Sequence, residues 1–445
     1  MKQLAAMLDL RAGGTAVLSL VAALLSNMAV AQVPGAYGLA DDLAPAGSSD
    51  ALAGTRVAPN EVPLGIHLGN LTAQPEASVT AGYDDNVLGA RRARGSAFNQ
   101  TQAVLQARSD WSRNSISARF SVDDLRYLDQ PRQSHTDFTA MVDGRYQIGR
   151  DTASLQYEHK TLSQTPRDLN VPQLDQPIAY RVDDIRFAYD ARFNQLTLRP
   201  NLDVTAFSYD DGSVAGQPYL QAYRNRTTLT PGILLTYELA PQRYLVGLIS
   251  NGVAAFRKPL PGALLLDYND MLALSGIDYD GGGLFRIRAL AGYEARSFSS
   301  PLLKSIQAPV AELTLIYRPT KLTTVTGTLS RRITDSADET VTGVTKTAAR
   351  LAVRHELLRD VVLNGTGEIA LEQYGRGQGE QTLLRAGADA TWLINRHAQL
   401  TATYVFQARQ SHLTALLGSA AQPGLQPSGG SFDSNRFGLQ VGFRL

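Results

Sequence analysis

Arginine is the residue type in this chain with the greatest capacity for chemistry. Only six of the 42 basic residues are Lys, and 41 residues are acidic. A guanidinium stays charged at every working pH and presents a planar fork of donors that binds carboxylates, phosphates and sugar hydroxyls. If the arginines share one face of the structure, we expect that face either to be held rigid by ion pairs or to bind oxygen-rich ligands, and the two roles are compatible.

Catalytic and metal chemistry finds little support in the sequence. The absence of Cys excludes thiolate zinc sites, iron–sulfur clusters and disulfides. His355-Glu356 begins like a zinc-peptidase helix, but Arg359 stands where the second His is needed, and Gly365–Ala370 fits a dinucleotide fingerprint without the helix that should follow it. We therefore expect no catalytic, cofactor-binding or metal-binding residues and no enzyme. A Ser–His hydrolase assembled across strands stays open as an alternative.

The first 31 residues have the layout of a secretory signal peptide. Lys2 and Arg11 precede and flank the apolar run Thr15–Leu25, and Ala29-Val30-Ala31 supplies a small-x-small cleavage site. Residues 32–75 are rich in Ala, Gly, Pro, Ser and Asp, which predicts a flexible periplasmic segment. The net charge of +1 gives no basic excess for a nucleic-acid partner.

From residue 76 onward the chain alternates polar and apolar side chains along extended segments. In Thr136–Ile148, Asp143 and Arg145 fall on one face and Val142 and Tyr146 on the other, because successive strand side chains point to opposite faces. The same alternation recurs in segments 153–160, 196–206, 361–372 and 398–409. Each segment is therefore predicted to be a strand with one wet face and one apolar face.

The connections between these strands alternate in length. Short connections such as 110–114 and 148–151 follow long ones such as 85–95 and 163–178. We predict an all-β fold, a closed, antiparallel, up-and-down transmembrane β-barrel over residues 76–445 with about 18 strands, or about 16 if the first strand is miscounted. A secreted β-sandwich is the rival, but it needs heavier apolar faces than these Ala- and Gly-rich ones.

Aromatic residues gather near both ends of the predicted strands. Beside the short turns they are Phe193, Tyr237, Tyr244, Phe285, Tyr317, Trp392 and Phe443, and beside the long loops they are Tyr83, Tyr127, Tyr209, Phe256, Tyr268, Phe298 and Tyr374. Two such bands are typical of the two headgroup interfaces of a membrane, where rings that are partly apolar and partly polar are favoured.

The polar face of each strand should line the barrel interior. The residues that we expect to line the pore are Arg119, Arg145, Arg199, Asp203, Arg286, Arg288, Glu294, Arg350, Arg354, Glu368, Arg385 and Asp389. A barrel of this size leaves an aqueous passage unless a loop folds into it. The arginines predict weak anion preference and binding of acidic glycans.

The C-terminal segment resembles the terminal strand of an outer-membrane protein, which the barrel-assembly machinery recognises. The residues that carry this assembly signal are Phe437, Leu439, Val441, Phe443 and Leu445. More widely, residues 74–445 resemble the putative β-barrel porin 2 family. The resembling stretches are Gly82–Val87, Arg108–Arg113, Thr136–Phe138 with Asp143–Tyr146, and Arg318–Thr323. This resemblance implies an association with exopolysaccharide production and export.

We therefore expect a channel in the outer membrane of a Gram-negative bacterium that passes hydrophilic material, with exopolysaccharide as the substrate that the resemblance implies. The alternatives are a general diffusion porin for small solutes and a plugged structural or docking barrel. The expected partners are outer-membrane lipid, the barrel-assembly machinery, polysaccharide and components of an export system, and we expect no cofactor.

Overall fold

Alternating side chains make almost the whole described chain into strands. The computed structural model describes residues 64–445 except 170, 172–173, 258–265, 336–342, 376–378 and 413–429. The expected signal peptide and residues 32–63 lie outside the described residues. No helix in the described part is long and apolar enough to cross a membrane.

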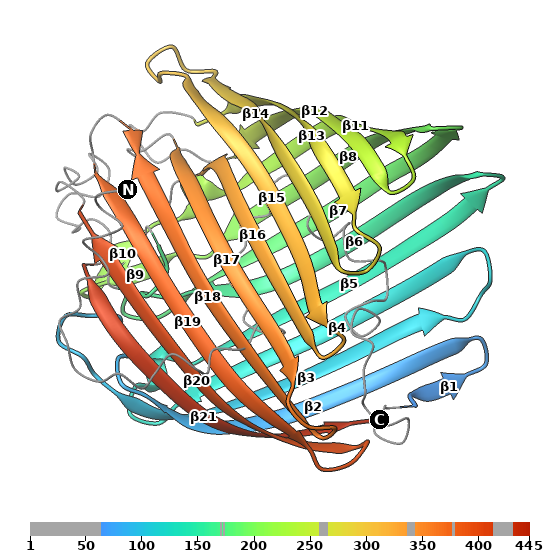
Figure 1. Cartoon of the computed structure of the whole chain (residues 1–445). Coiled ribbons are helices and arrows are strands. Elements are labelled where there is room, and N and C mark those ends of the chain that lie inside the picture. Colours follow the sequence, from blue (N-terminus) through green and yellow to red (C-terminus); the bar gives the residue numbers. More distant parts are fainter. Residues whose placement is uncertain are drawn as a thin grey trace.

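The strands and two short 3-10 turns follow one another along the chain (Figure 1). They are β1 (Ile66–Leu68), β2 (Leu71–Asp84), β3 (Ser96–Ser109), β4 (Ser115–Tyr127), η2 (Pro131–Gln133), β5 (His135–Ile148), β6 (Asp151–Gln164), β7 (Ile178–Phe193), β8 (Leu196–Tyr209), β9 (Gly212–Val214), β10 (Gln217–Tyr219), η3 (Ala222–Arg224), β11 (Arg226–Ala240), β12 (Arg243–Phe256), β13 (Tyr268–Asp280), β14 (Phe285–Phe298), β15 (Ile306–Thr320), β16 (Thr323–Thr334), β17 (Val344–Glu356), β18 (Val361–Tyr374), β19 (Glu380–Leu393), β20 (Ala398–Ser411) and β21 (Phe432–Arg444).

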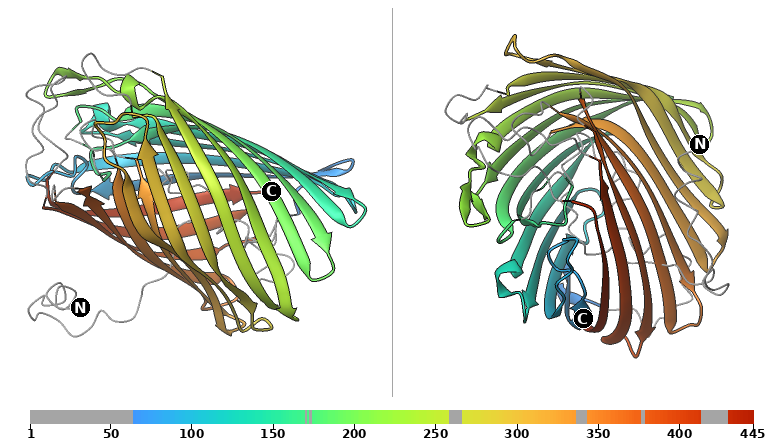
Figure 2. Two further views of the ribbon diagram at one scale, coloured as in Figure 1. Left: turned by 90° about the horizontal axis from the view of Figure 1, so that it is seen from above. Right: turned by 90° about the vertical axis from the view of Figure 1, so that its left-hand side faces the viewer.

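The sheet closes on itself. Each long strand pairs antiparallel with its neighbours in sequence, and β2 pairs with β21 from Glu76↔Arg444 to Asp84↔Arg436. The sheet has 19 strands, of which the three-residue β1 is only an extension along β2, so 18 strands form the barrel. Seen from the long-loop end, these strands run around a closed contour (Figure 2). The predicted fold class and strand count are confirmed.

Short turns occupy one end of the barrel and long loops the other. Asn194, in the turn between β7 and β8, has a positive φ of 43°, and Gly149, between β5 and β6, has a φ of 62°. Positive φ at such positions matches the twist of the paired strands, which explains why these turns can be so short. The described long loops include a small hairpin of β9 and β10 between β8 and β11.

The outer face is apolar in the middle of the barrel. Leu202 and Leu351 are 39% and 51% exposed although they lie inside long strands, because their side chains point away from the interior. The predicted assembly-signal residues Phe437, Leu439, Val441 and Phe443 lie on the same outward face of β21, and Leu445 directly follows that strand; all five are exposed. Lipid is the environment that such a face requires.

The inner face is less polar than its sequence pattern suggested. Buried apolar side chains from β11 to β15 pack together halfway along the interior wall, among them Leu248, Leu272 and Leu290. A Cβ at Gly276 or Gly292 would lie 1.9 Å or 1.8 Å from a carbonyl oxygen of the adjacent strand. Glycine is therefore needed where the backbones of β13 and β14 approach each other this closely.

The first barrel strand begins earlier than residue 76. β2 starts at Leu71 and pairs with β3 from its first residue, Leu71↔Ser109, whereas its pairing with β21 begins only at Glu76. Pro75 lacks an N–H and therefore marks an edge position in the sequence pattern. Its carbonyl nevertheless accepts a hydrogen bond from the Leu445 amide, and residues 66–68 and 71–75 form strands joined by a turn.

Adjacent residues at the centre of β8 provide a test of which face meets lipid. Leu202→Arg should reduce assembly, because a cation at the bilayer midplane costs about 2–4 kcal/mol on the lipid face. Asn201→Arg places the same charge on the interior face and should assemble normally. The measurement is the yield of heat-modifiable, folded protein in outer-membrane fractions. Equal yields would contradict the assigned faces.

Two glycines provide a test of orientation. Gly216 lies between β9 and β10 and Gly282 between β13 and β14, and among the described residues no heavy atom lies within 4 Å of a Cβ built at either position. An epitope inserted after Gly216 should bind antibody on intact cells, because long loops of outer-membrane barrels face outward. The same epitope after Gly282 should bind only after permeabilisation. The reverse result would mean that the short turns face the outside of the cell and the long loops face the periplasm.

Candidate functional site: the barrel interior and its mouth

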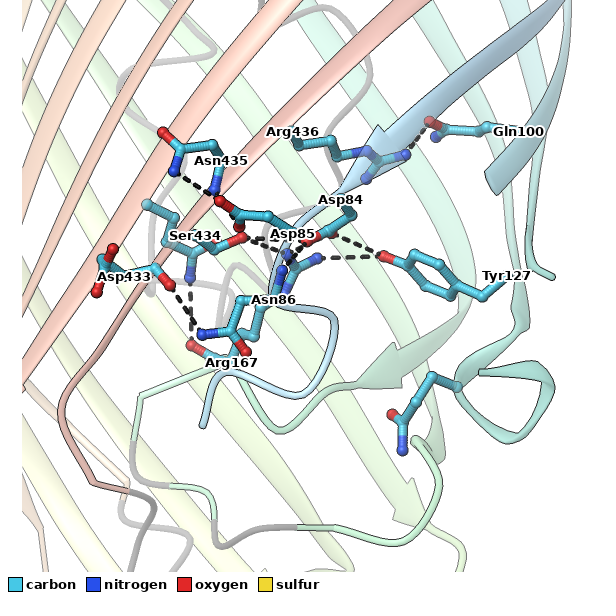
Figure 3. Close-up of polar contacts among 12 residues, drawn as sticks. Asp84, Asp85, Asn86, Gln100, Tyr127, Arg167, Asp433, Ser434, Asn435 and Arg436 are labelled. Carbon is cyan, nitrogen blue, oxygen red and sulfur yellow. Dashed lines mark hydrogen bonds and ion pairs between the residues drawn. The ribbon is translucent and has the colours of Figure 1, made fainter. Parts of the chain in front are cut away.

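The loop between β6 and β7 crosses the interior at the long-loop end, which we call the mouth. Arg167 of this loop donates to the Asp84 carboxylate at 2.7 Å, and its guanidinium also reaches the Ser434 hydroxyl at 3.4 Å (Figure 3). The Tyr127 hydroxyl donates to the same carboxylate at 3.1 Å. We call Asp84, Tyr127, Arg167 and Ser434 the mouth clamp.

The backbone of the loop is held as firmly as its side chain. Arg409 of β20, only 1% exposed, donates to the carbonyl oxygens of Pro166 and Asp168 at 3.2 and 2.7 Å. Gln407 donates to the carbonyl of Arg167 at 3.3 Å. Because β20 lies several strands away from β6 around the barrel, the loop must pass through the interior side of the mouth. A loop therefore does fold into the mouth and narrows it, which is the exception that the sequence analysis allowed for.

The two residues that follow β2, Asp85 and Asn86, form hydrogen bonds beside the mouth clamp. The Asp85 carboxylate accepts hydrogen bonds from the backbone and side-chain amides of Asn435 at 2.7 and 2.8 Å. The Asn86 side chain donates to the carbonyls of Ala90 and Asp433. These residues belong to the Gly82–Val87 stretch that resembles the porin family, so that stretch ties the loop after β2 to β21.

Burial and neighbouring charge shift the pKa of Arg167, the loop residue of the mouth clamp, in opposite directions. Burial alone would lower the pKa of Arg167, but the adjacent Tyr127 and Asp84 outweigh it and hold this pKa above its ordinary value. Asp84 is fully buried, so it needs the guanidinium and the hydroxyl donors to offset its loss of water. The clamp is thus charged, desolvated and mutually dependent.

A second buried cluster lies in the wall from β11 to β16. Asp335 accepts from Arg226 at 2.7 Å and from Arg296 at 2.6 Å, and Arg296 also binds Asp270 at 2.9 Å. Burial alone would raise the pKa of Asp335, but the two guanidinium groups hold it below its ordinary value. Each guanidinium also lies over a ring, Arg226 over Phe207 at 3.9 Å and Arg296 over Tyr268 at 4.0 Å.

The aromatic residues beside the long loops correct the prediction of two headgroup bands. Tyr127 and Tyr268 are 4% and 7% exposed and point into the interior, whereas Tyr83 is 51% exposed and points outward. Tyr209, Phe256, Phe298 and Tyr374 also lie on the inward face of their strands. At the mouth these rings stack with arginines and with each other. Beside the short turns, Tyr237, Tyr317, Trp392 and Phe443 do face outward, although Tyr244 does not.

All twelve residues predicted to line the pore lie on the interior face, but most are engaged with the wall. Arg286 and Arg288 both bind Asp278, at 3.1 and 2.9 Å, and Arg199 binds Asp190. Glu294 is 1% exposed and forms an ion pair with Arg332. Arg385 lies 3.7 Å from the Glu368 carboxylate. The Asp389 carboxylate accepts hydrogen bonds from Asn364 and Thr391. Asp203 lines a groove of the interior wall.

Four of the predicted arginines have no carboxylate partner within ion-pair distance among the described residues. These are Arg119 on β4, Arg145 on β5, and Arg350 and Arg354 on β17. Arg145 and Arg354 are exposed and the other two are half-buried. All four lie in the half of the barrel nearer the short turns, or at its midpoint.

The mouth clamp was not among the predicted site residues. Asp84 carried a signal in the family-like stretch, but Arg167 lies in a long loop whose path the strand pattern does not describe. The other motifs do not form sites in the described structure. His355 contacts Thr323 at 2.9 Å, and His159 contacts Asp183 at 2.8 Å on the outer face. No group of three His, Asp or Glu residues within the described ranges is placed to hold a metal.

Comparison with known proteins gives one family and several similar barrels. The family model described as putative beta-barrel porin 2 matches residues 59–420. No curated protein matches the chain. Among solved structures, the chain is similar to a BenF-like porin from Pseudomonas fluorescens Pf-5 (10% identity, TM-score 0.46, 85% of this chain and 99% of that one). It is also similar to OpdO of Pseudomonas aeruginosa, with 12% identity and a TM-score of 0.41 over 84% of this chain and 97% of that one. The FrpB iron transporter of Neisseria meningitidis is similar with 9% identity and a TM-score of 0.40 over 84% of this chain and 82% of that one.

The clamp makes Arg167→Gln informative. Removing one partner of a buried ion pair typically costs about 3–5 kcal/mol, because it leaves the other charge buried and unpaired. We expect the variant to unfold at lower urea concentration and to show higher single-channel conductance, since the loop loses its anchor.

Arg181→Gln is the matched control. Its ion pair with Asp210 is about half-exposed on both sides, so its loss should change stability by only about 0–1 kcal/mol. If Arg167→Gln behaved like this control in both measurements, the loop would not depend on the clamp.

Proposed function

The chain belongs to the putative β-barrel porin 2 family, and on that basis we propose that it exports exopolysaccharide across the outer membrane. Family and fold together make the protein a porin-like outer-membrane barrel channel. The proposed substrate rests on the association that the family resemblance implies and on the chemistry of the interior. We further propose that residues 1–31 are removed as a signal peptide and that the outward face of β21 is the signal for the assembly machinery.

The observation that supports passage of oxygen-rich material is the placement of the four carboxylate-free arginines. β5 and β17 are separated by eight strand pairings along the shorter way around the barrel, so Arg145 and Arg354 stand on nearly opposite walls. Guanidinium groups that face water from two sides attract carboxylates and bind sugar hydroxyls. This arrangement suits a hydrophilic path lined by charged side chains.

A general diffusion porin is the second candidate, and the mouth favours it. The loop held by the clamp narrows the entrance, as expected of a channel that selects small solutes. Export of a polymer requires that the chain pass beside this loop, along the wall formed by β8 to β19, or that the loop move. The two candidates therefore differ in whether the loop must be displaced for transport.

Replacing Arg119, Arg145, Arg350 and Arg354 with Gln tests this proposal. The variant should lose anion preference in reversal-potential measurements under a salt gradient, because charges in a narrow lumen are poorly screened. It should also release less polysaccharide from cells that carry it as their only copy. Conductance should persist, since Gln keeps a similar volume.

The control variant removes four charges outside the lumen. Arg92, Arg113, Arg132 and Arg359 are exposed in loops and turns, and their replacement by Gln should leave both measurements unchanged. A shifted reversal potential with unchanged polymer release would favour the diffusion porin. Two unchanged measurements would show that the four interior arginines do not take part in transport.

A further inference from the structure

A groove in the interior wall runs from the mouth toward mid-depth across β7 to β16. Four hydroxyl groups on three neighbouring strands line it, from Thr205, Thr228, Thr230 and Ser250. Thr205 and Thr228 lie directly opposite each other in the pairing of β8 and β11. The groove therefore presents a row of short hydroxyl side chains, of which Thr205 already donates to Asp184 and can still accept a hydrogen bond.

The charges of this groove nearly cancel. Its lining contains four arginines and five acidic residues, so the acids outnumber the arginines by one. A site for an anion needs the opposite balance, as the four free arginines deeper in the lumen provide. The groove is consequently suited to a neutral ligand with many polar groups rather than to a carboxylate or phosphate.

Buried polar atoms in the groove are left without hydrogen bonds. Within the described structure, Arg226 Nε, Arg296 Nε and Asp270 Oδ1 have no hydrogen-bond partner. Arg226 and Arg296 are each only 4% exposed. A buried donor or acceptor without a partner is unfavourable, so such atoms point to a ligand that the structure does not contain. Two of these atoms can only donate and one can only accept, and a hydroxyl satisfies both kinds.

The groups that surround these atoms are held in fixed positions. Arg226 is fixed between Asp335 and the ring of Phe207, and Arg296 between two carboxylates and the ring of Tyr268. A site that is rigid before binding loses little entropy when the ligand arrives. The ion pairs of this wall therefore serve recognition as well as stability.

We propose that this groove is a binding subsite for a neutral saccharide unit, occupied as a hydroxyl-rich chain passes the mouth. The subsite deepens the proposed export function and rests on it for its place in transport. It differs from the four arginines deeper in the lumen in the class of ligand, because it recognises hydroxyls without requiring negative charge.

Maltoheptaose is a suitable neutral probe, and heptagalacturonate is its acidic counterpart. In planar bilayers, maltoheptaose should cause reversible current blockades in the wild-type protein. The double variant Thr228→Val/Thr230→Val keeps the branched shape that strands favour but removes two hydroxyls. The blockades should then shorten roughly tenfold, as expected for the loss of two hydrogen bonds. Ser250→Ala tests the same groove with a smaller change.

Thr314→Val/Thr326→Val is the matched control. Both residues lie on the interior faces of β15 and β16, outside the groove, and the control should behave as wild type. Unchanged blockades in both groove variants would overturn the subsite. Stronger blockade by heptagalacturonate than by maltoheptaose, with the same sensitivity to the groove variants, would also overturn it, because the ligand would then be anionic.

Calorimetric titration of the detergent-solubilised protein with maltoheptaose separates this inference from the proposed function. Binding that the groove variants weaken, together with absent conductance, would support the subsite and contradict the channel. Conductance without binding or blockade would contradict the subsite and leave the channel standing.

Discussion

Closure of the sheet is the constraint on which the rest of this structure depends. A strand edge inside a bilayer would leave its N–H and C=O groups without partners, so β2 must find β21 even though most of the chain separates them. The mouth clamp lies at the same seam. Asp84 ends β2, while Ser434 and Asn435 belong to the beginning of β21, and Arg167 binds the two sides together. The loop that narrows the mouth is thus also a brace for the seam that closes the barrel.

Two populations of arginine follow from this arrangement. Near the mouth several guanidinium groups are buried, and each is compensated by neighbouring acceptors or rings: Arg226 and Arg296 by carboxylates and aromatic rings, and Arg409 by backbone carbonyls. Toward the short turns the interior is open, and Arg145 or Arg354 can remain charged without a partner. One residue type therefore stiffens one end of the lumen and sets the electrostatic potential of the other.

The sequence was sufficient for the barrel and for the direction of each side chain, because both follow from alternation with period two. It also sufficed for ion pairs between adjacent strands, since Asp278 and Arg288 lie directly opposite in the β13–β14 hairpin. The inward direction of Tyr127 could be predicted as well, as it shares the parity of Arg119. The aromatic bands were predicted from position along the strand without that parity, and half of the prediction was wrong for this reason.

Contacts that join distant parts of the chain could not be predicted. Arg167 lies in a loop far from Asp84 along the chain, and Arg296 of β14 reaches Asp335, which follows β16, across the intervening strand. Such contacts depend on tilt, curvature and loop path, which no local pattern specifies. These contacts also decide which polar groups of the interior are buried in ion pairs and which remain exposed to water. The groove at the mouth draws its lining from strands between β7 and β16, and the arginines without a carboxylate partner lie on β4, β5 and β17, so both depend on how the closed barrel brings distant strands together. The character of the interior surface therefore arises from the closure of the barrel rather than from any single motif.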